Sequence, residues 1–269
     1  MEAASAAMTP QRAVVPQAEP VNPIGPNLHS DAAALTGKLL QFPTAPVLIE
    51  RPAIRLRLML LGEFVLLFVC LPVGLFFSFA TALPRLPILW GGCVYALVVL
   101  LRDPTFDRRQ FWNGDGVRQQ LGQIMALFGT GVVVISALVH VYAPQLFLIL
   151  PRTHPVLWLV VIATYPVISV YPQGLVYRAF LLHRYRPLLQ PDPTGRPGML
   201  IFASAAAFAL MHVVFHNWEA IALTFLGGIL FARHYLNTKS MAATSLEHAL
   251  YGCFLFTIGL GQFFYVRPM

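Results

Sequence analysis

Four ionisable side chains stand inside long apolar stretches of this chain, where they could carry out chemistry. Arg178 follows one apolar run, His212 lies within a second, and Glu247 and His248 are adjacent in a third. Ionisable groups are costly in hydrocarbon, so we expect these side chains to face a polar cavity within a helix bundle. There a carboxylate or an imidazole can act as a general base toward water.

A metal site and purely structural roles are the alternatives for these residues. His212 and His216 are four residues apart, so a helix would place both on one face, where they could bind a metal. The sequence lacks the His-Glu-x-x-His signature of zinc proteases. Arg178 could instead reach toward lipid headgroups, and the Glu247-His248 pair could be a polar clamp between helices. Glu63 stands alone near a basic flank, as a residue at a helix start would.

Helices must position these residues, and hydropathy predicts about seven membrane-spanning helices. The fold class that we predict is an all-α, polytopic transmembrane bundle in residues 51–269. The expected spans are residues 58–80, 88–101, 124–141, 156–170, 199–214, 221–235 and 241–260. Residues 1–50 are rich in proline and alanine and have few aromatic residues, so we expect a disordered N-terminal arm there.

Composition and charge point to a lipid environment. Hydrophobic residues make up 57% of the chain and charged residues only 11%, with a mean hydropathy of +0.68, whereas soluble domains carry roughly 25% charged residues. The net charge of +7 comes from basic residues between apolar stretches. They therefore indicate membrane topology rather than nucleic-acid binding.

Basic residues alternate between the two sides of the expected bundle. One side would hold Arg51, Arg55, Arg57, Arg102, Arg108, Arg109, Arg118, Arg178, Arg184, Arg186, Arg196, Arg233 and Lys239; the other would hold Arg85, Arg152 and Arg267. Because lysine and arginine are enriched in cytoplasmic loops, this pattern predicts a cytoplasmic N-terminus and a C-terminus on the opposite side. We expect a multi-pass protein of a bacterial inner membrane, with the site near the cytoplasmic half.

The order of the motifs resembles the CPBP family, which includes the type II CAAX prenyl proteases and bacteriocin-processing or self-immunity proteins. The family pattern is Glu-Glu-x-x-x-Arg, then Phe-x-x-x-His, then His-x-x-x-Asn or Asp. Here Arg178, Phe208, His212 and His248 match, over a core of about residues 155–262. The glutamate pair corresponds to Gln173 and Gly174, and the last Asn or Asp corresponds to Gly252.

The resemblance implies an intramembrane endopeptidase whose glutamate and histidines activate water for attack on a peptide bond. Its partners would be the lipid bilayer and a protein or peptide substrate. No cofactor is required by the resemblance, although His212 and His248 leave a divalent metal open. The implied site is Gln173, Arg178, His212, Glu247 and His248.

The departures at Gln173 and Gly174 leave two hypotheses, because an amide cannot take a proton from water as a carboxylate does. In the first, Glu247 replaces the lost base and the chain is an active endopeptidase. In the second, the chain keeps the fold without proteolysis and acts as a membrane scaffold or peptide-binding protein. A proton-coupled transporter using Glu63, Glu247 and the histidines is a third class, but the sequence has no repeated half.

Overall fold

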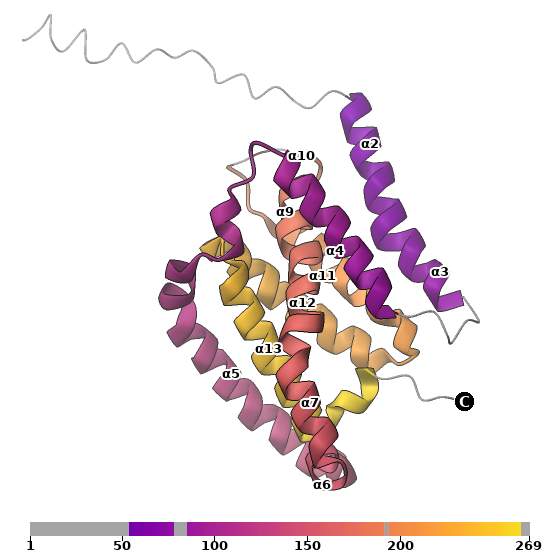
Figure 1. Cartoon of the computed structure of the whole chain (residues 1–269), viewed down its shortest axis with the longest axis vertical. Coiled ribbons are helices and arrows are strands. Elements are labelled where there is room, and N and C mark those ends of the chain that lie inside the picture. Colours follow the sequence, from indigo (N-terminus) through magenta and orange to yellow (C-terminus); the bar gives the residue numbers. More distant parts are fainter. Residues whose placement is uncertain (1–53, 78–84, 191, 193, 265–269) are drawn as a thin grey trace, which may run out of the picture. The chain divides into compact units, whose positions relative to one another are not determined.

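The computed structural model describes residues 54–77, 85–190, 192 and 194–264, and every regular element in these residues is a helix (Figure 1). The predicted all-α fold is therefore confirmed. The disordered arm that we expected in residues 1–50 lies outside the described residues.

The first half of the bundle contains three long helical stretches. The first is one continuous helix made of α2 (Ile54–Val65), a π-helical turn (Leu66–Cys70) and α3 (Leu71–Phe77). It is followed by α4 (Arg85–Arg102) and, after a short 3-10 turn (Arg108–Phe111), by α5 (Gly114–Tyr142). The short α6 (Ile149–Thr153) then leads to the next long helix.

A second continuous helix follows and carries several site residues. It consists of α7 (Pro155–Tyr165), a π-helical turn (Pro166–Val170), α8 (Tyr171–Gly174), a second π-helical turn (Leu175–Phe180) and α9 (Leu181–Arg184). Pro166 has no N–H to donate, which accounts for the first departure from α-helical bonding. π-Helical turns often occur at functional sites, because they rotate the side chains that follow relative to those before.

The last part of the chain completes the bundle. α10 (Arg186–Leu189) leads to α11 (Gly198–Met211), a 3-10 turn (His212–Phe215), α12 (Trp218–Thr238), α13 (Met241–Ile258) and a final 3-10 turn (Leu260–Phe264). Side chains cap the starts of α12 and α13. Asn217 accepts a hydrogen bond from the Ala220 N–H at 2.8 Å, and Ser240 accepts one from the Ala243 N–H at 3.1 Å.

Four helical stretches are long and apolar enough to cross a membrane: Ile54–Phe77, Gly114–Tyr142, Pro155–Arg184 and Gly198–Phe215. They correspond to four of the seven expected spans. The second expected span is the shorter apolar helix Leu86–Arg102. The sixth and seventh form α12 and α13, whose ionisable side chains, such as Glu247, lower their mean hydropathy. The spanning role of these three helices stays a prediction.

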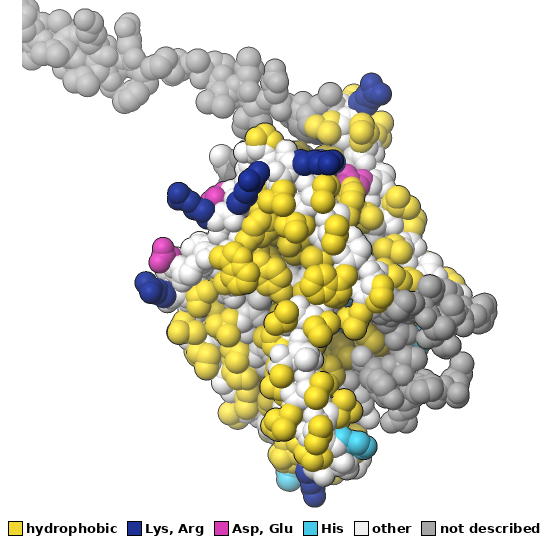
Figure 2. Space-filling model, in the orientation of Figure 1, with side chains coloured by type: hydrophobic (Ala, Val, Ile, Leu, Met, Phe, Trp, Pro, Cys, Tyr) yellow, Lys and Arg dark blue, Asp and Glu magenta, His cyan; other side chains and the backbone are white. Residues whose placement is uncertain are grey.

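One end of the bundle gathers the basic loops, which we call the basic end. Asn113, before α5, donates to the Thr238 carbonyl oxygen at 3.0 Å, and Ser240 donates to the Asn113 carbonyl oxygen at 2.7 Å. After α4, Asp103 lies 2.9 Å from His183 of α9. These contacts join the loops, and in Figure 2 most visible lysine and arginine side chains lie at this end. The basic end carries Arg55, Arg57, Arg102, Arg108, Arg109, Arg118, Arg184, Arg186, Arg196, Arg233 and Lys239.

The opposite end joins a different set of segments and carries few charges. The Leu148 N–H donates to the Ile258 carbonyl oxygen at 3.2 Å, which ties the turn before α6 to the end of α13. Asn217 donates to the Phe263 carbonyl oxygen at 2.8 Å, which ties the start of α12 to the last 3-10 turn. Arg152, in α6, lies at this end. The expected alternation of basic loops thus appears as two distinct ends of the described bundle.

Candidate functional site

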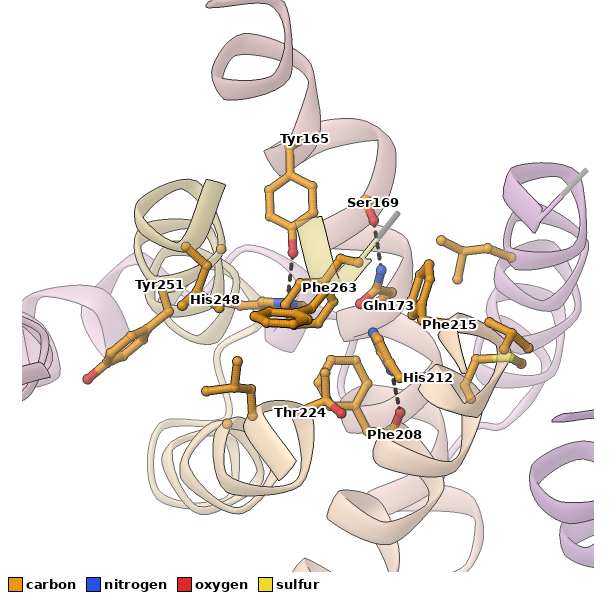
Figure 3. A pocket seen from close by; sticks show the side chains of 18 of the residues that line it. Tyr165, Ser169, Gln173, Phe208, His212, Phe215, Thr224, His248, Tyr251 and Phe263 are labelled. Carbon is orange, nitrogen blue, oxygen red and sulfur yellow. Dashed lines mark hydrogen bonds between the residues drawn. The ribbon is translucent and has the colours of Figure 1, made fainter. Parts of the chain in front are cut away.

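A cavity of about 1520 Å³ lies among α3, α4, α7–α8, α11, α12 and α13 (Figure 3). Most of its wall is leucine, isoleucine, valine and phenylalanine. Its polar side chains include Tyr165, Ser169, Gln173, His212, Thr224 and His248. The described residues that line it include no Asp, Glu, Lys or Arg. The cavity therefore offers neutral hydrogen-bonding groups on an apolar surface.

His212 lies where α11 gives way to a 3-10 turn, and its ring is fixed by the backbone. Its Nδ1 is 2.7 Å from the carbonyl oxygen of Phe208, one turn earlier. A carbonyl only accepts, so Nδ1 carries the proton and Nε2 keeps its lone pair. The ring extends from this bond toward the side chain of Gln173 (Figure 3). His212 thus presents a proton acceptor to the cavity.

His248, from the middle of α13, lines the same cavity. Its Nε2 is 3.3 Å from the hydroxyl oxygen of Tyr165, and its ring stacks on Phe231 with centroids 4.8 Å apart. The two histidines therefore meet at one cavity, as the sequence predicted. Their catalytic roles remain predictions.

Gln173, which the sequence resemblance aligns with the first family glutamate, also lines the cavity. Its Nε2 donates to the Ser169 hydroxyl at 2.7 Å, one turn earlier on the same helix. The next residue, Gly174, faces away from open space, since a Cβ there would lie 2.9 Å from Cε of Met241. A side chain at position 174 would require Met241 to move, whereas a carboxylate would fit at position 173 in the present shape of the glutamine.

Tyr165 fills the space that a side chain would need at Gly252, which the sequence resemblance aligns with the last family Asn or Asp. A Cβ on Gly252 would overlap Cε1 of Tyr165 and lie 2.7 Å from its Oη. The tyrosine comes from the end of α7, and its hydroxyl is the same one that contacts His248. Tyr165 was not predictable from the sequence, because only the helix packing shows that it fills the space beside Gly252.

Arg178 and Glu247 lie behind the cavity wall rather than in it. Arg178 is 1% exposed and its guanidinium lies 4.1 Å from the centre of the Phe208 ring. None of its three guanidinium nitrogens has a hydrogen-bond partner among the described residues. Neither Arg178 nor Glu247 is among the residues that line the cavity. The site residues thus divide into a cavity set and a buried set.

Glu247 is held in a buried pair with a histidine that is distant in the sequence. Its Oε2 lies 2.7 Å from Nδ1 of His234 on α12, and the two side chains are 0% and 1% exposed. His234 follows Arg233 near the basic end of α12, so its sequence resembles that of an interfacial segment. The sequence signal that could have revealed the pair is His234 itself, an ionisable residue within the expected span 221–235. The pairing accounts for a buried carboxylate without assigning it to catalysis.

The cavity does not present the ligand set of a zinc site. Zinc sites use three or four nitrogen, sulfur or carboxylate ligands from the protein. In the part of the chain that the structure describes, no group of three or more His, Cys, Asp or Glu side chains could hold a metal ion. A metal on His212 and His248 would have only these two protein ligands.

The part of the chain that contains Gln173, His212 and His248 matches a known family model. Residues 153–254 match the family model described as type II CAAX prenyl endopeptidase Rce1-like. This region of the chain is therefore similar to the CAAX proteases. The CAAX-protease-like region contains Gln173, Arg178, His212, Glu247 and His248, so the resemblance read from the sequence is confirmed. None of the curated proteins and none of the solved structures matches the chain.

Proposed function

We propose that this chain binds a peptide segment in its intramembrane cavity without hydrolysing it. Residues 153–254 match a family model of type II CAAX prenyl endopeptidases, and this similarity supports a peptide as the occupant. The cavity supports the same class of ligand, since its apolar wall suits side chains and its few neutral polar groups suit backbone N–H and C=O groups.

One observation supports the proposal that the peptide is not hydrolysed. No carboxylate is found among the described residues that line the cavity. Gln173 has the shape of a glutamate, but its amide does not accept a proton from water. Glu247 is engaged with His234 and lies outside the cavity lining. The cavity histidines have no acidic partner among the described lining residues, and we infer that a bound peptide is retained intact.

The second candidate is the active endopeptidase, and a specific observation favours it. The bond from Nδ1 of His212 to the Phe208 carbonyl leaves Nε2 free to accept a proton from a water in the cavity. In this candidate the imidazole, or Glu247 after a rearrangement, takes the role of the missing glutamate. A divalent metal on His212 and His248 belongs to the same candidate.

We also propose an orientation and a location. The positive-inside rule applied to the basic end assigns that end to the cytoplasm, and the start of α2, at Arg55 and Arg57, lies there too. The N-terminal side of the bundle is then cytoplasmic. A bacterial inner membrane stays a prediction from the sequence.

Binding can be tested with the purified chain in lipid nanodiscs and a dansyl-labelled apolar peptide. Leu230→Trp adds bulk to the cavity wall and should weaken peptide binding about tenfold, a loss of about 1.4 kcal/mol. Val133→Trp places the same side chain on an exposed position of α5, 69% exposed, and should leave the affinity unchanged. Thermal unfolding checks that both variants are folded. Equal affinities for the wild type and Leu230→Trp would reject the cavity as the peptide site.

A further inference from the structure

Tyr165 lies in the cavity against one face of α13, which fixes the position of its hydroxyl. His248, Gly252 and Phe256 are four residues apart along α13, so they form one row on the helix surface. Gly252 has no side chain, and the tyrosine ring lies where a Cβ would overlap it. The ring meets Phe256 edge-on with centroids 5.3 Å apart, and its hydroxyl reaches His248 (Figure 3). The hydroxyl is therefore held at a defined point of the cavity wall.

The contact between Tyr165 and His248 leaves hydrogen-bonding capacity unused. The distance of 3.3 Å between Oη and Nε2 is longer than the usual hydrogen-bond range of about 2.7–3.2 Å. A hydroxyl has one donor and two lone pairs, and His248 is its one hydrogen-bond partner among the described residues. When Nε2–H of His248 donates to Oη, the hydroxyl proton is free to point into the cavity. Tyr165 then offers a donor that no described residue takes up.

Several other polar side chains of the lining use their donors within the protein. The hydroxyls of Thr164 and Thr224 donate to carbonyl oxygens one turn earlier on their own helices, at 2.7 and 2.6 Å. Nδ1 of His212 does the same, and Gln173 donates to the hydroxyl one turn before it at 2.7 Å. A peptide carbonyl that enters this apolar cavity loses its hydrogen bonds to water and needs a donor from the wall. Tyr165 can supply that donor.

We propose that Tyr165 binds the peptide directly, by donating its hydroxyl proton to one backbone carbonyl oxygen while Nε2–H of His248 donates to the hydroxyl oxygen. This inference deepens the proposed function, on which it rests for a peptide as the occupant. The neutral hydroxyl suits an uncharged carbonyl, because a carboxylate would meet no Lys or Arg among the described residues of the lining. Tyr165 thus determines where along the cavity a peptide group is held.

The Tyr165→Phe variant tests this role with the dansyl-labelled apolar peptide in nanodiscs. The phenylalanine ring keeps the packing against Gly252 and Phe256 and removes only the hydroxyl. Loss of one hydrogen bond should weaken peptide binding about three- to tenfold. Tyr142→Phe removes a hydroxyl from a tyrosine that is 80% exposed at the end of α5, and should leave the affinity unchanged. If Tyr165→Phe binds the peptide as tightly as the wild type, the hydroxyl serves only the packing around His248 and the inference is overturned.

Thioamide analogues of the same peptide identify the atom that the hydroxyl binds. Each analogue replaces one carbonyl oxygen by sulfur, which accepts hydrogen bonds more weakly, and keeps the N–H. One analogue should bind the wild type about threefold more weakly than the parent peptide, and should show no such loss with Tyr165→Phe. Equal binding of all analogues to the wild type overturns the inference without any variant, as does an equal loss in both proteins.

The Leu230→Trp variant separates failure of this inference from failure of the proposed function. If Leu230→Trp weakens peptide binding and Tyr165→Phe does not, the peptide occupies the cavity without using the hydroxyl, and only this inference is wrong. If neither substitution changes the affinity, or the wild type binds no peptide, the proposed function is rejected and this inference with it.

Discussion

At the scale of single residues, Glu247 and His248 show how neighbours in the sequence can serve different purposes. Successive residues of an α-helix point about 100° apart, so a helix at the edge of a cavity turns only one of two neighbours toward it. In α13 His248 faces the cavity, while Glu247 faces α12 and pairs with His234 at 2.7 Å. The carboxylate therefore has a structural partner, and its cost in the membrane interior is offset there.

Replacing Glu247 tests whether its role is structural. Glu247→Gln should lower the free energy of unfolding by about 1.5 to 3 kcal/mol, the usual contribution of a hydrogen bond to a charged group. Peptide affinity should not change, because position 247 does not line the cavity. Unfolding and binding are measured in the same nanodiscs. The exposed Asp115→Asn variant is the control and should cost less than about 1 kcal/mol.

A different outcome would support Glu247 as the general base of an active endopeptidase. If Glu247→Gln unfolds like the wild type but loses a cleavage activity that the wild type possesses, the active endopeptidase is the better account. The same substitution therefore separates the two hypotheses that the sequence left open.

The sequence could predict which of these residues are internal but not all of the directions in which they point. His212 and His248 were predictable as cavity residues because histidines deep in apolar runs must find polar surroundings. The separate positions of Arg178 and Glu247 were not, because two π-helical turns rotate the helix around Gln173 and because the partner His234 lies on another helix. The periodicity of apolar residues along one helix reveals neither the rotation by π-helical turns nor a partner on another helix.

At the scale of elements, α7 and α13 approach each other through Tyr165 and Gly252. The tyrosine ring fills the space that a side chain at position 252 would need, and its hydroxyl contacts His248 from that position. The family pattern has a polar side chain at the position of Gly252. We interpret Tyr165 and Gly252 as two linked departures from the family pattern. The Tyr165 hydroxyl from α7 takes the place of a polar side chain at position 252 of α13.

A double-mutant cycle tests this packing. Gly252→Asn should destabilise the chain by about 1 to 3 kcal/mol, because the new Cβ overlaps the tyrosine ring. In a Tyr165→Val background the same substitution should cost less, with a coupling energy of about 0.5 to 3 kcal/mol. The free energies of unfolding of the four proteins give the coupling directly.

The control for this cycle is Gly122→Asn, at a glycine of α5 whose added Cβ would have no atom within 4 Å. Its cost should be the same with and without Tyr165→Val. Additive costs for Gly252→Asn as well would mean that Tyr165 does not occupy the space beside Gly252.

Span positions were predictable at this scale, whereas helix boundaries and breaks were not. Apolar length identified the stretches that became Ile54–Phe77, Gly114–Tyr142, Pro155–Arg184 and Gly198–Phe215. The fourth expected span ended at residue 170, but the helix continues through the site to Arg184, because Pro172 and the π-helical turns are accommodated without a break. Local hydropathy falls at the polar site residues and therefore underestimates the length of this helix.

At the scale of the whole molecule, the chain combines an apolar cavity with an asymmetric charge distribution. The described basic side chains gather mainly at one end of the bundle, and the described residues that line the cavity include no Lys or Arg. The cavity presents His212, His248 and Gln173, which the sequence resemblance aligns with a family glutamate. We propose that the missing carboxylate at position 173 separates this chain from an active endopeptidase.

Cleavage of membrane-anchored fluorogenic peptides by the wild type, Gln173→Glu and Gln173→Glu with His212→Ala tests that claim most directly. The carboxylate fits the space of the glutamine and can accept a hydrogen bond from the Ser169 hydroxyl, which now accepts one from the Gln173 amide. The wild type should not cleave, Gln173→Glu should gain activity by about 10²–10⁴-fold over background, and the double variant should be silent again. Cleavage by the wild type that is lost in His212→Ala would contradict the claim and establish an endopeptidase that works without a carboxylate at position 173.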